Sequence, residues 1–522
     1  MLPSSTTADG TISRRPNFYT IGSCVVASSG ALLFGLDVGI TGGVIAMPSF
    51  LEKFFPDILE SQQDSANTGN SNSYCAYNSQ LLSLFTSSFF LAGMISSVFA
   101  SWLTERHGRK ASMCLGAALY LLGSVLGVTA ANTPMLIIGR IILGFGCGFA
   151  NQSVPVFLSE LPPSSSRGAL QTCFEVFVFI GILLAGIINY YTSRVGYGWR
   201  ISLGTFIPPA LVLLIGCFFL PETPTFLYSS NNVVKARVTL QQLRGAGTNI
   251  DDEFASIERD AQEAMKFGSF SQQLRTLLSR PYRGELTVAC CVAMFSQLTG
   301  INSMLYYTPV LFSSTSGGSD SGLVQAIAVS VVLLGGALTS LVVIDRVGRR
   351  PLLMAGGMTM FILQTATSLL LLYTVDPYSL VGPSPAASDV LLVLICLFTY
   401  AFGWSWGPLG WSIPVESQTQ STRAAASTFS VVTNFFIVFL TTQLFLPMFC
   451  VMQWGTFLFF ACFDLIMSAF AWKLVVETRG IPIHDMRREF QSHSYWKRYA
   501  QEQTRAPANN LIVDVTSDSY EQ

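Results

Sequence analysis

The sequence predicts an all-α membrane protein with twelve transmembrane helices arranged in two six-helix halves. Half of its 522 residues are hydrophobic and only 11% are charged, whereas soluble globular proteins carry about 25% charged residues. The charged residues fall in short blocks, and the apolar runs between them reach roughly 20 residues, enough for a helix to cross a bilayer. A basic turn at 106–110 (Arg-His-Gly-Arg-Lys) returns at 346–350 (Arg-Val-Gly-Arg-Arg), which indicates that the chain is duplicated.

Further pairs of residues repeat with equal spacing in the two halves. Glu160 and Arg167 in the first half correspond to Glu416 and Arg423 in the second half. The Glu-Thr dipeptide at 222–223 likewise returns at 477–478. Two tandem membrane halves that meet at a central cleft are expected of a transporter that rocks one half against the other.

The apolar runs place the individual helices. We expect spans at 18–47, 80–104, 111–131, 134–158, 169–192, 199–220, 284–312, 321–344, 351–375, 389–415, 424–449 and 452–476. The first span follows two arginines but is far longer than the apolar core of a signal peptide, and it lacks a persuasive cleavage site. We therefore expect it to be retained.

The basic residues set the expected orientation. The turns after even-numbered helices contain Arg106, Arg109, Lys110, Arg167, Arg346, Arg349, Arg350 and Arg423. The opposite turns are mainly acidic, with Glu52, Asp57, Glu60 and Asp64 beside Lys53, Arg194 and Arg200. The positive-inside rule therefore places the basic turns and both termini in the cytoplasm, and we expect a multi-pass protein of the plasma membrane.

The spans also divide the chain into five parts. These are a cytoplasmic tail at 1–17, a first half at 18–220, a cytoplasmic linker at 221–283, a second half at 284–476 and a cytoplasmic tail at 477–522. Helical periodicity in the linker occurs around 233–243 and 254–264. We interpret the linker as a solvated tether that carries short amphipathic helices.

Eleven cysteines are present, and nine of them lie inside predicted spans or at their cytoplasmic ends. Only Cys75 and Cys450 reach the oxidising face of the membrane, where disulfides persist. They either form a disulfide that ties the two halves together near the outer rim of the cleft, or they remain two unpaired thiols.

Four ionisable residues lie within the predicted spans, namely Asp37, Arg140, Glu175 and Asp464. A charge in hydrocarbon is costly, so each requires a partner or a function. Asp37 lies in a segment, 34–43, in which glycines recur at every fourth position and form a face for close helix packing. Arg140 is the expected cation beside it. If the two approach only in one conformation, the proton affinity of Asp37 differs between states, as coupling requires. The alternative is a static buried ion pair.

Several other classes of protein are excluded. All three histidines, His107, His484 and His493, lie in cytoplasmic turns or the tail, so no histidine-based catalytic or metal site is expected in the membrane. We expect neither an enzyme nor a cofactor. The basic residues occur two or three at a time and form no nucleic-acid surface. The glycines at 144, 146 and 148 follow no strand, so we expect a helix-packing face rather than a phosphate loop.

A set of motifs points to one family. They occupy 37–43, 74–75, 106–110, 139–140, 158–160, 221–224, 297–302 (Gln-Leu-Thr-Gly-Ile-Asn), 403–411 (Gly-Trp-Ser-Trp-Gly-Pro-Leu-Gly-Trp) and 477–480. In combination they resemble the sugar porter family of the major facilitator superfamily, particularly its plant and green-algal proton–monosaccharide symporters. The resemblance covers about 18–485. It implies a major facilitator fold and proton-coupled import of a monosaccharide, a hexose, by alternating access in a monomer.

The resemblance also implies roles for individual residues. Asp37 matches the proton-binding aspartate and Arg140 its partner. Sugar ligands are expected at Gln297, Asn302, Trp411 and Asn434. Cys75 and Cys450 match a disulfide pair. A cytoplasmic charge network that locks the outward-open state is expected from Arg106, Arg109, Glu160, Arg167, Glu222, Arg346, Arg349, Glu416, Arg423 and Glu477.

The physical chemistry of a sugar supports these ligands. Amide side chains both donate to and accept from hydroxyls without burying a charge, and Trp411 offers a flat apolar wall. Each amide could instead form an interhelical hydrogen bond, and Trp411 could be ordinary core packing.

Three positions depart from the family pattern. Glu175 and Ser296 stand where plant-type members carry glutamine, and Leu333 stands where they carry asparagine. A hydroxyl that faces Leu333 loses its partner on leaving water, so the preferred sugar is expected to differ. Glu175 is a strong acceptor for two hydroxyls, a second titrating site, or a protonated acid in place of glutamine.

Two other functions are compatible with the same framework. A sensor would bind sugar without moving it, and the changes at Glu175, Ser296 and Leu333 favour that alternative. An uncoupled facilitator would equilibrate sugar without moving protons, but the retention of Asp37 and Arg140 argues against it. Asp464 has no assignable partner.

Overall fold

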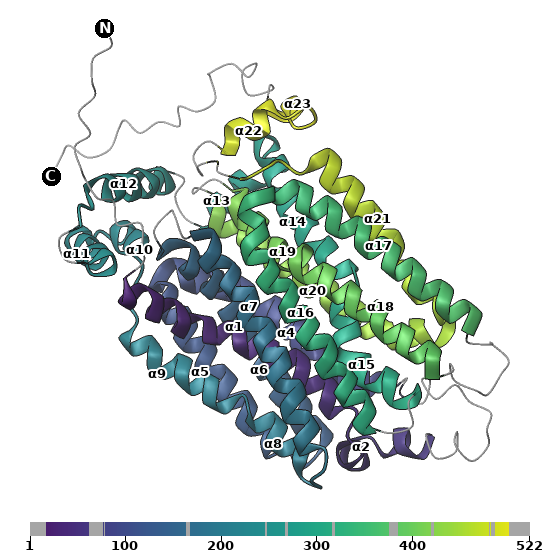
Figure 1. Cartoon of the computed structure of the whole chain (residues 1–522). Helices are drawn as coiled ribbons and strands as arrows, with labels where there is room; N and C mark the ends of the chain where they lie inside the picture. The colour runs from purple at the N-terminus through teal and green to yellow at the C-terminus, as the bar shows by residue number, and fades with distance from the viewer. Residues whose placement is uncertain are drawn as a thin grey trace, which may run out of the picture.

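The computed structural model describes residues 17–61, 77, 79–162, 167–245, 248–266, 270–315, 319–374, 385–418, 422–479, 481 and 486–500. Within these residues helices dominate and no strand occurs (Figure 1). Twelve of the described spans are long and apolar enough to cross a membrane, which confirms the number predicted from the sequence.

The first half of the chain contributes six spans and one short helix. Its helices are α1 (Phe18–Val44), α2 (Pro48–Phe54), α4 (Gln80–His107), α5 (Arg109–Val128), α6 (Thr133–Glu160), α7 (Arg167–Thr192), α8 (Gly198–Gly204) and α9 (Ile207–Phe219). Helices α8 and α9 together form the sixth span.

The second half repeats this arrangement. Its helices are α14 (Arg283–Leu298), α15 (Ile301–Thr315), α16 (Ser319–Val347), α17 (Arg349–Thr374), α18 (Pro385–Trp404), α19 (Trp406–Glu416), α20 (Arg423–Met452) and α21 (Trp454–Leu474). The short helices α22 (Met486–Ser492) and α23 (Lys497–Ala500) follow.

Two spans of the second half are broken, although the sequence analysis treated them as continuous. The first break separates α14 from α15 at Gly300, which has φ +77°. A side chain there would meet the ring of Phe460 at 2.9 Å, so both the conformation and the space require glycine. The second break separates α18 from α19 at Ser405, where ψ is −94°. At the first break the carbonyl of Thr299 is satisfied from another helix, by the Gln364 amide at 2.8 Å.

Glycines allow helices of the first half to approach closely, as the sequence predicted. A Cβ on Gly35 would lie 1.8 Å from the carbonyl oxygen of Val178 on α7, and one on Gly39 would lie 2.5 Å from Cβ of Ala185. On α6, a Cβ on Gly144 would lie 2.2 Å from a backbone oxygen of α4. Gly148 also faces α4, and a Cβ on Gly146 would lie 2.8 Å from the Gly116 carbonyl oxygen of α5, so these three glycines pack inside a helix against two neighbours.

The linker forms helices α10 (Pro224–Ser229), α11 (Val233–Arg244), α12 (Asp251–Lys266) and α13 (Phe270–Leu277). The periodicity had predicted α11 and α12. However, this linker is more than a solvated tether, because it packs on the first half. The hydroxyl of Thr20 donates to the carbonyl of Leu243 at 2.7 Å, and Arg244 donates to the carbonyl of Leu161 at 3.1 Å.

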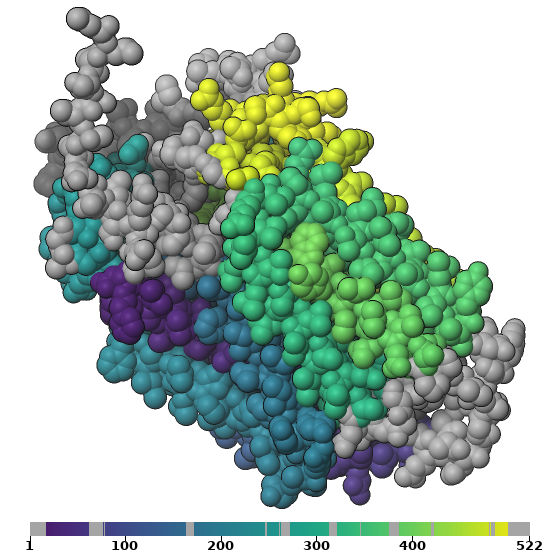
Figure 2. Space-filling model, viewed as in Figure 1, coloured from purple at the N-terminus to yellow at the C-terminus, as the bar shows by residue number. Residues whose placement is uncertain are grey.

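The two halves lie side by side, and the linker helices sit at one end of the bundle (Figure 1). We call this the linker end; α2 lies at the opposite end. In Figure 2 the two halves are in contact over the face in view. Helices α4 and α20 join them along their length. Ser87 donates to Gln443 at 2.6 Å, and Thr428 donates to Ser101 at 2.7 Å.

Candidate functional site

The buried charges of the first half form an ion pair. Asp37 on α1 is 0% exposed and Arg140 on α6 is 1% exposed. The guanidinium donates to both carboxylate oxygens, through Nη1 to Oδ1 and through Nη2 to Oδ2 at 3.3 Å. Its Nε donates to the carbonyl of Phe85 at 3.2 Å, and it lies 5.1 Å from the centroid of the Phe85 ring. The carboxylate and the guanidinium are therefore isolated from water but satisfied by each other.

A residue of the second half completes this pair. The hydroxyl of Tyr306, on α15, donates to Oδ2 of Asp37 at 3.2 Å, and Tyr306 is 0% exposed. Its backbone lies against Gly42 of α1, where a Cβ would be 2.8 Å from the Tyr306 carbonyl oxygen. Tyr306 is not among the residues predicted from the sequence, because nothing in the local pattern shows which partner it faces.

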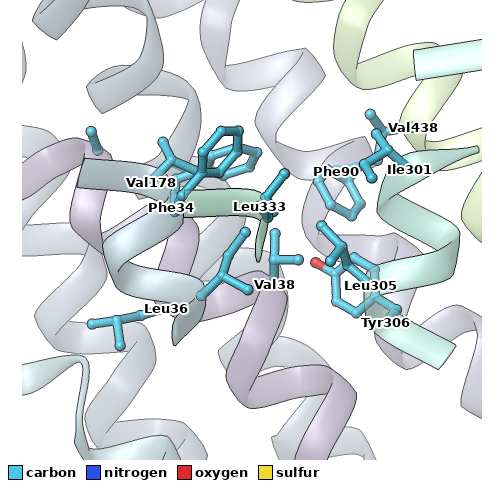
Figure 3. Packing of buried hydrophobic residues seen from close by; sticks show 14 of the residues in the cluster. Phe34, Leu36, Val38, Phe90, Val178, Ile301, Leu305, Tyr306, Leu333 and Val438 are labelled. Carbon is cyan, nitrogen blue, oxygen red and sulfur yellow. The ribbon is translucent and has the colours of Figure 1, made fainter. Parts of the chain in front are cut away.

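Apolar side chains from both halves pack around this contact and exclude water from it. Figure 3 shows part of this apolar cluster with Tyr306, including Phe34, Val38, Phe90, Leu305 and Leu333. Leu333 is fully buried in this cluster, so it offers no polar group to the interior.

A small cavity of about 20 Å³ lies between the halves near this cluster. Gly39 and Asn189 line it from the first half, and Thr308 and Ser330 line it from the second. Because Gly39 is only two residues from Asp37, the cavity leaves room for about one water molecule close to the ion pair.

The first break in the second half brings two amide side chains together. Gln297 lies in the last turn of α14 and Asn302 in the first turn of α15. The Asn302 amide donates to Oε1 of Gln297 across the break. Both amides therefore point to one place where backbone and side-chain polar groups are concentrated.

The aromatic candidate lies against the first half. The ring centroids of Trp411, on α19, and Phe174, on α7, are 5.6 Å apart. One residue before Trp411, a Cβ on Gly410 would lie 3.0 Å from Cβ of Ser296 on α14. Trp411 thus sits between the fifth span and the broken seventh span.

Two further candidates are buried polar groups. Asn434 on α20 is 2% exposed, and its Oδ1 has no hydrogen-bond partner among the described residues. Glu175 on α7 is 4% exposed. Buried polar atoms in native proteins nearly always have a partner, so the Oδ1 of Asn434 has a free position for a hydrogen-bond donor.

The sequence matches the family described as "Sugar (and other) transporter" over residues 23–490. The chain belongs to this sugar transporter family. It is 40% identical over 508 residues to Sugar transport protein 11 of Arabidopsis thaliana, a match that covers 97% of this chain and 96% of the relative. It is 42% identical over 490 residues to H(+)/hexose cotransporter 2 of Parachlorella kessleri, with 94% and 90% covered.

The fold of this transporter also resembles solved structures. It is similar to XylE of E. coli, a proton:xylose symporter of the major facilitator superfamily, in a complex with 6-bromo-6-deoxy-D-glucose. The TM-score is 0.75 at 25% identity, and the match covers 90% of this chain and 98% of the other. This transporter therefore has the major facilitator fold and is not an enzyme.

The basic turn of the first half of the transporter is anchored by Glu222. Gly108, with φ +92°, ends α4, and α5 begins at the next residue. The backbone N–H groups of Arg109 and Lys110 donate to the Glu222 carboxylate at 3.1 and 3.3 Å. The Arg109 guanidinium also donates to Glu160 at 2.7 Å. A carboxylate at a helix N-terminus satisfies free N–H groups and the helix dipole.

The second basic turn has the same construction. Gly348 has φ +102°, and the N–H groups of Arg349 and Arg350 donate to Glu477 at 2.9 and 3.1 Å. The Arg349 side chain forms an ion pair with Glu416 at 3.2 Å. The sequence repeat is thus a structural repeat, and the two ion pairs each stay within one half.

Other members of the expected charge network lie apart from these pairs. Arg106 and Arg346 are exposed, and no ion pair joins either of them to a described residue. The Arg106 guanidinium lies 5.5 Å from the centroid of the Trp102 ring. Arg423 is buried at the start of α20, whereas the side chain of Arg167 is outside the described residues.

The remaining candidates of the transporter are a cysteine pair and a buried acid. Cys450 lies in the last turn of α20, which ends at Met452 rather than at 449; Cys75 is outside the described residues. Asp464 on α21 is 0% exposed, and neither of its carboxylate oxygens has a hydrogen-bond partner among the described residues.

Proposed function

We propose that this protein imports a monosaccharide, a hexose, together with a proton across the plasma membrane by alternating access, and that it works as a monomer. The observation that carries the proposal is the contact of Asp37 with both Arg140 and Tyr306. It joins the fully buried ion pair of Asp37 and Arg140 to a helix of the other half. The names of the relatives, a hexose cotransporter and a xylose symporter, support the same function.

The coupling step follows from the electrostatics of this contact. A proton that arrives from outside neutralises Asp37 and removes its attraction to Arg140. The hydrogen bond from Tyr306 then loses its charged acceptor and becomes weaker. Protonation therefore changes a contact between the halves, and α15 is released to move with the second half. Conformations with and without this contact then differ in their proton affinity at Asp37. Binding of a proton therefore shifts the equilibrium between them.

The sugar site in this proposal lies between the halves at Gln297, Asn302, Trp411 and Asn434, with Glu175 and Ser296 beside it. The amides supply donors and acceptors for hydroxyls, and the unpartnered Oδ1 of Asn434 accepts one more. Trp411 covers the apolar face of the ring. Since Gln297 and Asn302 flank the break before α15, sugar binding and Asp37 protonation act on the same helix.

The driving force is sufficient for accumulation. A proton that crosses about 100 mV releases about 2.3 kcal/mol, and a gradient of one pH unit adds about 1.4 kcal/mol. Together they sustain roughly a 500-fold sugar gradient at one proton per sugar.

The proposed orientation places the linker end and both termini in the cytoplasm. The basic turns at that end, held by Glu222 and Glu477, would then form the cytoplasmic charge network. We also expect a disulfide between Cys75 and Cys450 on the outer face. Nine other cysteines, all among the described residues, are free, so they do not compete for this pairing.

Uptake measurements test the function directly. Transport-deficient cells that express the protein should accumulate labelled glucose, galactose, fructose or xylose above the external concentration, and a protonophore should abolish the accumulation. Sugar addition should make an unbuffered medium more alkaline. Equilibration without a pH change would instead identify a facilitator, and binding without uptake would identify a sensor.

A further inference from the structure

Glu175 is a buried acid that the coupling scheme does not use. It is 4% exposed, and no described cation or hydrogen-bond donor reaches its carboxylate. Asp37, in contrast, is held by Arg140 and Tyr306. Burial without a counter-charge favours the neutral acid, so only a cation bound from outside the chain would hold Glu175 as a carboxylate.

Helix packing places Glu175 at the level of Trp411. The Phe179 ring lies 3.3 Å from the position of a Cβ on Gly407 of α19, and Phe174 packs against Trp411 four residues further along α19. The two helices thus run in opposite directions. Glu175 is one turn before Phe179 and shares its face of α7, so it is directed toward α19 beside Trp411.

On α14, which packs beside Trp411 on the other side of the site, the polar side chain at this position is only a short serine. Ser296 approaches Gly410 next to Trp411, and its hydroxyl is already bonded to the carbonyl of Ala293 at 2.9 Å. A serine hydroxyl reaches less far than an amide and brings no charge. Ser296 therefore brings no charge toward Glu175, and no described cation pairs with that acid.

We propose that Glu175 selects amino sugars, that is, hexoses in which an ammonium group replaces one hydroxyl. This inference rests on the proposed sugar transport. An ammonium supplies the missing counter-charge and up to three donors, and it forms a charge-assisted hydrogen bond that a neutral hydroxyl cannot match. The face of Trp411 beside it attracts the same cation. A neutral hexose fills the same volume but forms only neutral hydrogen bonds with the protonated acid.

Uptake of D-glucosamine, D-glucose and 2-deoxy-D-glucose tests the inference, because these sugars differ only at one carbon. The assay is run at mildly acidic external pH, where the amine is protonated. Wild-type protein should take up glucosamine with a higher kcat/KM than either neutral sugar. Glu175→Gln should lower the glucosamine-to-glucose ratio of kcat/KM by roughly 10- to 100-fold, the loss expected for one hydrogen bond between charged groups. Glu175→Asp should retain part of the preference.

Asp464→Asn is the matched control. It removes an equally buried acid that also lacks a partner, but on α21, and it should leave the ratio unchanged. A wild-type protein that imports glucose without preferring glucosamine, or a ratio that Glu175→Gln does not change, overturns the inference but leaves the proposed function intact. If no sugar enters the cells, the proposed function fails. In that case, thermal stabilisation of the purified protein by glucosamine still decides the inference: stabilisation lost in Glu175→Gln supports it, and none in the wild type refutes it.

Discussion

Tyr306 donates its hydroxyl to Oδ2 of Asp37 at 3.2 Å, and this bond joins the second half of the protein to the first. Asp37 is simultaneously bound by Arg140 within its own half. The carboxylate thus accepts hydrogen bonds from a guanidinium of its own half and from a phenol of the other half. Any change in its charge therefore alters a hydrogen bond between the two halves.

Replacing Asp37 with asparagine should abolish accumulation of sugar against a gradient. The amide keeps the size of the side chain but cannot bind and release a proton, so the halves lose their electrostatic response to the proton gradient. The measurement is the steady-state ratio of internal to external labelled sugar, with and without a protonophore. The Asp464→Asn variant should still accumulate sugar, and undiminished accumulation by Asp37→Asn would remove Asp37 from coupling.

Replacing Tyr306 with phenylalanine should reduce uphill uptake by about tenfold or more, because a hydrogen bond to a charged group contributes about 1.5–3 kcal/mol. The matched control is Tyr307→Phe. The Tyr307 hydroxyl also bridges the halves, but it contacts Thr86 at 3.3 Å and not Asp37. Only Tyr306→Phe should change how uptake depends on external pH. An equal change in both variants would show that Tyr306 acts in packing alone.

Part of this site could be predicted from the sequence because the relevant signals are local. A glycine at every fourth position marked the face of α1, and charges inside apolar runs marked Asp37 and Arg140. The bond from Tyr306 could not be predicted, because its partner is 269 residues away. The breaks at Gly300 and Ser405 were also missed. The runs on either side remain apolar, and what breaks each helix is a backbone conformation and its packing rather than a change in composition.

The linker illustrates the same limit. Helical periodicity predicted α11 and α12, because the spacing of apolar residues along one helix face can be read from the local sequence. Their docking depends on single long-range bonds, such as that from Arg244 to the carbonyl of Leu161. Such bonds leave no periodic signal.

Replacing Gly35 with alanine should prevent α1 from packing on α7, because the added Cβ would lie 1.8 Å from the Val178 carbonyl oxygen. Backbone cannot give way as a flexible side chain does, so we expect a loss of stability at or above the ~1–3 kcal/mol usual for overpacking. Gly22→Ala on the same helix is the control, since nothing lies within 4 Å of its Cβ. Thermal unfolding in detergent compares the two. Equal unfolding temperatures would contradict the packing argument.

Glu222 should make stability depend on pH. Burial raises the pKa of its carboxyl above the ordinary 4.5, against the hydrogen bonds from the N–H groups of Thr223, Lys110 and Arg109, which lower it. The folded state then holds a proton on Glu222 more tightly than the unfolded state does. The resulting stabilisation is complete below the unfolded pKa and is lost as the pH rises through the folded pKa.

Replacing Glu222 with glutamine removes this titration, so the difference in unfolding temperature between wild type and Glu222→Gln should shift in favour of the variant as the pH rises above 4.5. Glu222→Ala separates this effect from capping. It leaves the N–H groups of Arg109 and Lys110 without acceptors and should be less stable than Glu222→Gln by about 0.5–2 kcal/mol at every pH. A difference between wild type and Glu222→Gln that is independent of pH would show that burial does not govern this carboxyl.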